Sequence, residues 1–300
     1  SVTISKYNNL IASYLKALHK EVLWAAEWIN ENNAYIDTVY IGGGTPTALP
    51  EKDLEYLLTR IVPVLPLKNI REYTVEAGRP DTLNCRKLNI IKNAGVSRIS
   101  INPQTMQDKT LNLIGRNHTA KQIVEAYNMA RAEGLNNINC DLIAGLPGET
   151  EKDFEDTLIK VGKLNPDSVT VHTMAVKRAS RLINEKGNFE QTDDETVNNM
   201  VEMAGAFLRS IGMHPYYLYR QKNILANLEN IGYAKPGAEG IYNILIMEDV
   251  QSILAFGAGA SSKIVHSGNS IERVFNVRNV EHYIQRIDEM IERKAKSLDT

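Results

Sequence analysis

The stretch Tyr40-Ile41-Gly42-Gly43-Gly44-Thr45-Pro46-Thr47 decides how this chain folds. The residues just before the glycines, 36–41, are short, apolar and β-branched, a pattern typical of a buried strand. Three consecutive glycines remove every side chain from the loop that follows, so its backbone amides can approach a ligand closely. A tight strand-to-helix connection uses the same residue types. The stretch by itself therefore leaves both a turn and a ligand-binding loop open.

Strand-like and helix-like segments alternate on both sides of this loop. A long amphipathic helix is expected at 4–30, before the first strand. The later strands are expected at 72–76, 98–101, 137–143 and 168–172, and the helices at 51–61, 82–93, 119–133 and 150–163. Such alternation demands a parallel sheet with right-handed crossovers, in either a barrel or a doubly wound arrangement.

Unusual residues stand at the carboxyl ends of the expected strands: the glycines, Glu76, Gln104, Asp141 and Ala175. Barrels build their active sites at that end of the strands. We therefore predict an α/β fold that forms a barrel or a partial barrel.

The rhythm changes after residue 180. A helix is expected at 194–211, and the tyrosine-rich segment 216–219 and the apolar runs 241–246 and 253–256 follow it. A charged helix from about Val280 closes the chain. We predict a partial barrel over 1–212 and a smaller, β-rich extension over 213–300.

Composition excludes several classes of protein. Lys and Arg total 34 and Asp and Glu total 36, so the net charge of −2 gives no footprint for nucleic acid or an anionic membrane. No apolar run approaches the ~20 residues that cross a bilayer. The two cysteines, Cys85 and Cys140, exclude a disulfide framework and are too few for a zinc site or an iron–sulfur cluster. We expect a soluble, cytoplasmic protein.

Six motifs occur in order along the chain. They are 42–47 (GGGTPT), 74–76 (TVE), 98–100 (RIS) leading to Gln104, 114–118 (IGRNH), 141–147 (DLIAGLP) and 257–260 (GAGA). Together they resemble the radical S-adenosylmethionine (SAM) enzymes related to oxygen-independent coproporphyrinogen III oxidase. The stretches 75–82 and 233–242 look most like the coproporphyrinogen dehydrogenase branch of HemZ type. The resemblance covers nearly the whole chain.

This resemblance implies a partial (β/α)6 barrel that holds SAM and a [4Fe–4S] cluster. Gly42, Gly43, Gly44 and Thr45 would form the loop that holds the methionine amino group, and Arg116 would pair with its carboxylate. The strand-end residues Glu76, Gln104 and Asp141 would bind the ribose hydroxyls or the ammonium. Ala175 and the region of Lys263 would line the adenosine pocket.

Each candidate residue also has a purely structural interpretation. Glu76 and Arg116 could be solvated surface charges, whereas Asp141 lies in an apolar strand, where an unpaired carboxylate would be costly. The histidines at 118, 172 and 214 are more typical of packing or hydrogen bonding than of catalysis. The tyrosines at 216, 217 and 219 are more typical of sheet packing than of a porphyrin surface.

The chain departs from the family pattern in three places. The family's C-x-x-x-C-x-x-C loop and the first barrel strand are missing, so we expect a fragment that begins just after the cluster ligands; a cluster-free homologue is the alternative. Asn102 and Pro103 replace the usual glycine and valine before Gln104. Haem chaperones of the family carry a His-Asn pair where this chain has Tyr242-Asn243.

Two functions follow from the resemblance. The first is radical SAM oxidation of a propionate side chain of coproporphyrinogen III to a vinyl group, with a tetrapyrrole substrate and an electron donor such as flavodoxin or ferredoxin. The second is a non-catalytic haem- or SAM-binding protein on the same fold. A dinucleotide-binding enzyme fits less well, because Thr47 stands where the third glycine of that motif is required.

Overall fold

The computed structural model describes residues 8–175, 192–220, 228–266, 268 and 270–299. The chain forms two compact units. The first comprises Ser1–Tyr40, Ala48–Tyr73 and Ile241–Thr300, and the second comprises Ile41–Thr47 and Thr74–Gly240. Strands β1 (Thr38–Ile41) and β2 (Glu72–Gly78) therefore each begin in the first unit and end in the second. The expected domain boundary at residue 213 stays a prediction.

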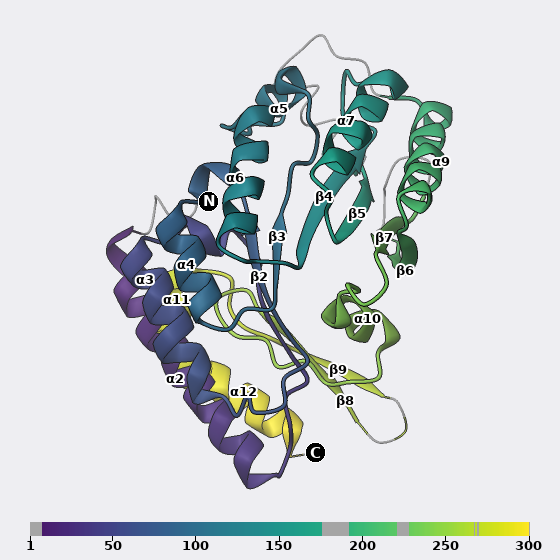
Figure 1. Ribbon diagram of the computed structural model, residues 1–300. Helices are drawn as coiled ribbons and strands as arrows, with labels where there is room; N and C mark the ends of the chain where they lie inside the picture. Colours follow the sequence, from purple (N-terminus) through teal and green to yellow (C-terminus); the bar gives the residue numbers. More distant parts are fainter. Residues whose placement is uncertain (1–7, 176–191, 221–227, 267, 269, 300) are drawn as a thin grey trace. The chain divides into compact units, whose positions relative to one another are not determined.

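A seven-stranded sheet carries the functional part of the fold (Figure 1). After β1 and β2 its strands are β3 (Arg98–Ile101), β4 (Ile138–Ala144), β5 (Ser168–Thr173), β6 (His214–Tyr219) and β7 (Asn230–Ala234). Their order is β1-β2-β3-β4-β5-β7-β6. Strands β2 to β5 pair in parallel, whereas β7 pairs antiparallel with both β5 and β6. This curled, parallel-rich half-barrel confirms the predicted fold class.

Helices follow the strands of the second unit, and a polar side chain caps the start of each of them except α5. They are α4 (Cys85–Asn93), α5 (Asp108–Leu113), α6 (Ala120–Ala132), α7 (Glu151–Lys163) and α9 (Asp194–Ser210). Thr150 and Asp153 form a capping box at the start of α7, and Thr119 and Gln122 form the same device at α6. Helix α4 begins at Cys85, later than the predicted residue 82, because the side chain of Asn84 caps it.

The two faces of the parallel strands differ sharply in chemistry. One face carries buried apolar side chains from alternate positions: Val75, Ile99, Ile138, Cys140, Leu142, Val169 and Val171. The other face carries Arg98, Ser100, Asn139, Asp141, Ser168, Thr170 and His172, which we call the polar face. Successive side chains of a strand point to opposite faces, so the register of the sheet separates the two sets.

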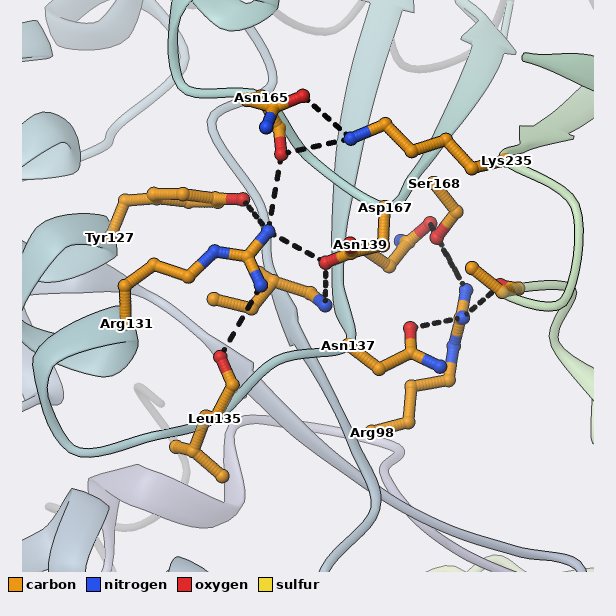
Figure 2. Close-up of polar contacts among 12 residues, drawn as sticks. Arg98, Tyr127, Arg131, Leu135, Asn137, Asn139, Asn165, Asp167, Ser168 and Lys235 are labelled. Atoms are coloured by element: carbon orange, nitrogen blue, oxygen red, sulfur yellow. Dashed lines mark hydrogen bonds and ion pairs between the residues drawn. The ribbon is translucent and has the colours of Figure 1, made fainter. Parts of the chain in front are cut away.

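An ionic cluster ties the amino ends of β4 and β5 together (Figure 2). The Arg131 guanidinium donates to Tyr127 Oη at 2.6 Å, to the Asn165 carbonyl at 3.1 Å and to Asp167 Oδ2 at 2.6 Å. Asp167 also accepts the first backbone N–H of β4 at 2.9 Å, and Lys235 Nζ lies 2.6 Å from Asn165 Oδ1. These contacts fix the strand starts at the end of the sheet opposite to the glycine loop.

The first unit is built around the long helix α2 (Ile11–Glu31), preceded by a 3-10 turn at Asn8–Leu10. Residues 4–7 of the predicted first helix lie outside the described residues. The other elements are α3 (Glu51–Tyr56), a π-helical turn (Leu57–Ile61), a 3-10 turn (Val62–Val64), α10 (Ile241–Glu248), the hairpin β8 (Ser261–Val265) and β9 (Ile271–Phe275), α11 (Val280–Gln285) and α12 (Ile287–Leu298). Among the described residues, no helix has both the length and the apolar content of a membrane span.

The apolar run 241–246 lies in helix α10, although the sequence placed it in a β-rich extension. The carboxylate of Glu72 accepts the backbone N–H of Ile241 at 2.7 Å and that of Tyr242 at 3.3 Å. These two N–H groups lie in the first turn of the helix, which leaves them without intrahelical partners. The capping carboxylate comes from a residue far away in the chain, so no local pattern predicts it.

A buried ion pair joins α2 to the carboxyl-terminal part of the first unit. Lys294 Nζ lies 2.5 Å from Glu21 Oε1, and both side chains are fully buried. Glu21 also accepts hydrogen bonds from Asn276 Nδ2, Tyr283 Oη and the Gly257 N–H, at 2.7, 2.6 and 2.9 Å. Burial lowers the pKa of Lys294, and the Glu21 carboxylate opposes that shift. The cluster satisfies Glu21 fully, as a buried charge requires.

Lys294→Met should destabilise the protein by about 3–5 kcal/mol, because it leaves the Glu21 carboxylate buried without its counter-charge. The free energy of unfolding in urea measures this loss. Lys296→Met is the matched control on the same helix, where the side chain is 75% exposed and its removal should change stability by at most about 0.5 kcal/mol. Equal losses in the two variants would contradict the role given to the buried pair.

Candidate functional site

The glycine loop follows β1 and is open on its outer side. Gly42, Gly43 and Gly44 are exposed, and Gly43 has the left-handed φ of +85°. A Cβ built on Gly43 or Gly44 would meet no atom within 4 Å, so nothing in the fold itself demands glycine for space at these positions. The positive φ of Gly43 does demand it, and the bare backbone leaves room for a ligand to approach.

The buried side chain of Thr47 and the half-buried side chain of Thr82 anchor this loop at the carboxyl end of β2. Thr47 Oγ1 donates to the Ala77 carbonyl at 3.0 Å and lies 2.7 Å from Thr82 Oγ1. Lys87 Nζ donates to the carbonyls of Thr47 and Thr82, at 2.5 and 3.1 Å. The fold therefore brings the glycine loop to the strand that carries Glu76.

Asp141 lies on the polar face and has partners there. Its Oδ1 accepts from Asn139 Nδ2 at 2.7 Å, and its Oδ2 lies 3.7 Å from His172 Nε2. Asn139 Nδ2 also lies 3.1 Å from Ser100 Oγ, and Ser100 pairs in register with Glu76. The structure thus gives Asp141 partners on the polar face, and places Glu76 on the same face, with β3 between their strands.

Gln104 lies directly beside Asp141. Its backbone N–H donates to the Asp141 carbonyl at 2.8 Å, and its own carbonyl accepts from the Ile143 N–H at 2.9 Å. Gln104 has a φ of +68°, which is uncommon for a residue with a side chain. Such strained backbone costs on the order of 1–3 kcal/mol and clusters at functional sites. No sequence pattern around Gln104 predicts this conformation.

Glu149 supports the segment that follows Gln104, although no pattern in the sequence singles it out. Its carboxylate accepts from Thr105 Oγ1 at 2.5 Å, and only 5% of the residue is exposed. Thr157 Oγ1 in turn accepts from the Met106 N–H at 3.1 Å. Burial raises the pKa of Glu149 to about 7. A glutamate between Gly148 and Thr150 looks like a loop residue in the sequence, so only the tertiary structure shows its burial.

The remaining candidates are less tightly connected. Arg116 is half-buried in the turn after α5, and Ala175 is half-buried just beyond β5. Burial and the positive charge of Arg116 both lower the pKa of His118, against the opposing charge of Asp81. Lys263 belongs to the first unit, where its Nζ pairs with an Asp249 carboxylate oxygen at 2.7 Å. The role of all these residues in binding stays a prediction.

The described residues contain no group of three His, Cys, Asp or Glu side chains that could hold a metal ion. Cys140 is fully buried on the apolar face, where burial raises the pKa of its thiol, and Cys85 is exposed at the start of α4. The two lie on different elements, as the sequence predicted. They do not fit an iron–sulfur cluster.

Comparison with known proteins identifies the fold. The sequence matches the Radical SAM superfamily over residues 16–161. It is 45% identical to the oxygen-independent coproporphyrinogen-III oxidase-like protein HemZ of Bacillus subtilis over 96% of this chain and 58% of HemZ. It is 34% identical to the haem chaperone HemW of the same organism, over 93% of this chain and 69% of HemW. The chain belongs to the radical SAM superfamily.

The solved structure of coproporphyrinogen III oxidase (HemN) from Escherichia coli has the same fold. The TM-score is 0.72 at 21% identity, over 94% of this chain and 63% of HemN. This chain spans little more than half the length of HemZ and about two thirds of HemW. Membership of the radical SAM superfamily implies SAM and a [4Fe–4S] cluster as cofactors. The open glycine loop and the polar face fit SAM, whereas the described residues do not supply the cluster's ligands.

The raised pKa of Glu149 predicts a specific pH dependence of stability. Its pKa rises from an ordinary 4.5 to about 7 on folding, so its contribution is fully present below pH 4.5 and is lost as the pH rises through 7. The loss between pH 5 and 8 should be a few kcal/mol, at about 1.4 kcal/mol per unit of pKa shift.

Glu149→Gln should remove this component, because an amide does not titrate and its oxygen still accepts from Thr105. Urea midpoints at pH 5 and pH 8 measure the difference. Glu155→Gln, an exposed glutamate on α7, should keep the pH dependence of the unaltered chain. An unchanged dependence in Glu149→Gln would show that Glu149 is not the group responsible.

Proposed function

We propose that this chain is the SAM-binding part of a radical SAM oxidoreductase that decarboxylates propionate side chains of coproporphyrinogen III to vinyl groups. One observation carries the SAM assignment. The exposed glycine loop is anchored to the end of β2. In the same sheet, Gln104, which follows β3, is in backbone contact with Asp141 of β4. Backbone groups, a carboxylate and an amide then converge at one end of a parallel sheet, where α/β folds bind their ligands.

The residues of the second unit divide the cofactor between them in this proposal. The backbone of Gly43, Gly44 and Thr45 binds the methionine ammonium, and Arg116 binds the carboxylate through its fork of donors. Glu76 and Asp141 accept hydrogen bonds from the ribose hydroxyls. Support for this division comes from the placement of the loop, Glu76 and Asp141 in one unit. Gln104 and Ala175, also in the second unit, complete the set of proposed SAM contacts, whereas the expected role of Lys263, in the first unit, stays a prediction.

The [4Fe–4S] cluster of a radical SAM enzyme supplies the electron that cleaves SAM. The described residues do not fit the cluster, so its ligands are not assigned to them. What these residues do is bind SAM, orient it and keep Asp141 and Gln104 in place. An electron donor such as flavodoxin or ferredoxin and a cytoplasmic location are part of the same proposal.

The tetrapyrrole substrate is supported by the relatives rather than by the geometry. HemZ is named for its likeness to coproporphyrinogen-III oxidase, and HemW is named a haem chaperone. A non-catalytic haem-binding function is therefore the second candidate. At the position where haem chaperones of the family carry histidine, Tyr242 stacks on Tyr40 with ring centroids 4.4 Å apart. A stacked tyrosine pair supplies no imidazole for haem iron, which favours the first candidate.

SAM binding tests the core of the proposal. Isothermal titration calorimetry should detect SAM binding to this chain, and Asp141→Ala should weaken it about tenfold or more, because hydrogen bonds to a charged group contribute about 1.5–3 kcal/mol. Asp156→Ala, which removes a carboxylate that is 46% exposed on α7, is the matched control and should leave SAM affinity unchanged. Absence of SAM binding to the unaltered chain would refute the assignment.

The choice between the two candidate functions needs the full-length protein. After anaerobic reconstitution with iron and sulfide, an enzyme should form 5′-deoxyadenosine and convert coproporphyrinogen III, as measured by mass spectrometry. This chain alone should form no 5′-deoxyadenosine under the same conditions, because it has only two cysteines. Haem binding by the full-length protein without any 5′-deoxyadenosine would favour the chaperone-like function.

A further inference from the structure

Two tyrosines of β6 reach across β7 to the polar face of β5. Tyr217 lies opposite Gly232 of β7, which itself lies opposite Thr170 of β5. A Cβ on Gly232 would lie 1.9 Å from Tyr217 Cε1, so the ring of Tyr217 occupies the space that a side chain at Gly232 would need. Because of this glycine, the Tyr217 hydroxyl comes within 3.4 Å of Thr170 Oγ1.

Tyr217, Tyr219 and His172 form a single surface, which we call the aromatic wall. The rings of Tyr217 and Tyr219 are parallel to within 5°, with centroids 6.2 Å apart. The His172 ring meets the Tyr219 ring at 71°. All three residues are half-buried, so part of each ring is open to a ligand.

A chain of polar contacts ties the wall to Asp141. The Tyr219 hydroxyl lies 3.2 Å from His172 Nδ1, and His172 Nε2 lies 3.7 Å from Asp141 Oδ2. Burial raises the pKa of Tyr219 to about 12, so its phenol keeps its proton at neutral pH and can either donate to Nδ1 or accept from it, according to the tautomer of His172.

The chemistry of the wall suits a flat apolar ring that carries an anionic arm. Parallel tyrosine faces stack on conjugated rings. The 3.4 Å contact between Tyr217 and Thr170 is long for a hydroxyl pair, so the Tyr217 O–H is available to a stronger acceptor such as a carboxylate. On the same face of the sheet, the buried Arg98 guanidinium donates to Ser168 Oγ at 2.6 Å (Figure 2).

We propose that the aromatic wall recognises the substrate, with Tyr217 and Tyr219 contacting one pyrrole ring and the Tyr217 hydroxyl donating to that ring's carboxylate arm. His172 is a positioning residue that links the wall to Asp141. The inference rests on the proposed function, because it takes a carboxylated tetrapyrrole as the ligand.

Coproporphyrin III is the probe, and its fluorescence reports binding to the intact chain. Tyr217→Phe should weaken binding about tenfold, because it removes one hydrogen bond to a charged acceptor. Tyr233→Phe is the matched control: Tyr233 is on β7 next to Gly232 but points to the opposite face, so binding should not change. The tetramethyl ester of coproporphyrin III has no charged acceptor, and the effect of Tyr217→Phe on its binding should be several-fold smaller.

SAM affinity, measured on the same variants by calorimetry, separates this inference from the proposed function. Tyr217→Phe should bind SAM as the unaltered chain does, and equal far-UV circular dichroism would show that the variant is folded. Unchanged coproporphyrin III binding in Tyr217→Phe, or an equal loss for the acid and the ester, would contradict the proposed role of the aromatic wall. If the unaltered chain binds SAM but does not bind coproporphyrin III, the proposed role of the aromatic wall is contradicted, whereas the proposed SAM site is not.

Discussion

The side-chain amide of Asn139 is the contact on which the functional face depends. Its Nδ2 donates to Asp141 and lies 3.1 Å from Ser100 Oγ, while its Oδ1 accepts from Ser168 at 2.9 Å, so one residue joins three neighbouring strands. Buried polar groups are costly unless each is satisfied. A register slip of one residue would turn this amide into the apolar layer and leave its partners unpaired. The network therefore fixes which side chains face the ligand.

The strained backbone of Gln104 lies where hydrogen bonds from neighbouring residues stabilise it. Gln104 keeps its left-handed backbone because the Asp141 carbonyl and the Ile143 N–H both bind it, extending the ladder between β3 and β4. Thr105, the next residue, is fastened to Glu149 in the loop after β4. The conformation of Gln104 is thus determined from two sides, and a cofactor can meet a preformed site without ordering the loop itself.

The relatives show why the fold and the function must be argued separately. HemZ and HemW bear names of different activities, yet this chain matches both along most of its length. The loop and strands proposed to bind SAM lie within residues 16–161, the range that matches the superfamily as a whole. The aromatic wall proposed for substrate recognition lies outside that range, where Gly232 gives Tyr217 the space to cross β7.

The sequence by itself determined the alternation of strands and helices and the family, because these depend on local periodicity and short motifs. It also placed the glycine loop at a strand end. Only the tertiary structure decided that α10 is helical, that Glu149 is buried and that Tyr217 reaches Thr170. Each of these depends on a partner distant in the chain: Glu72 for α10, Thr105 for Glu149 and Gly232 for Tyr217. Contacts between residues so far apart leave no periodic trace in the sequence.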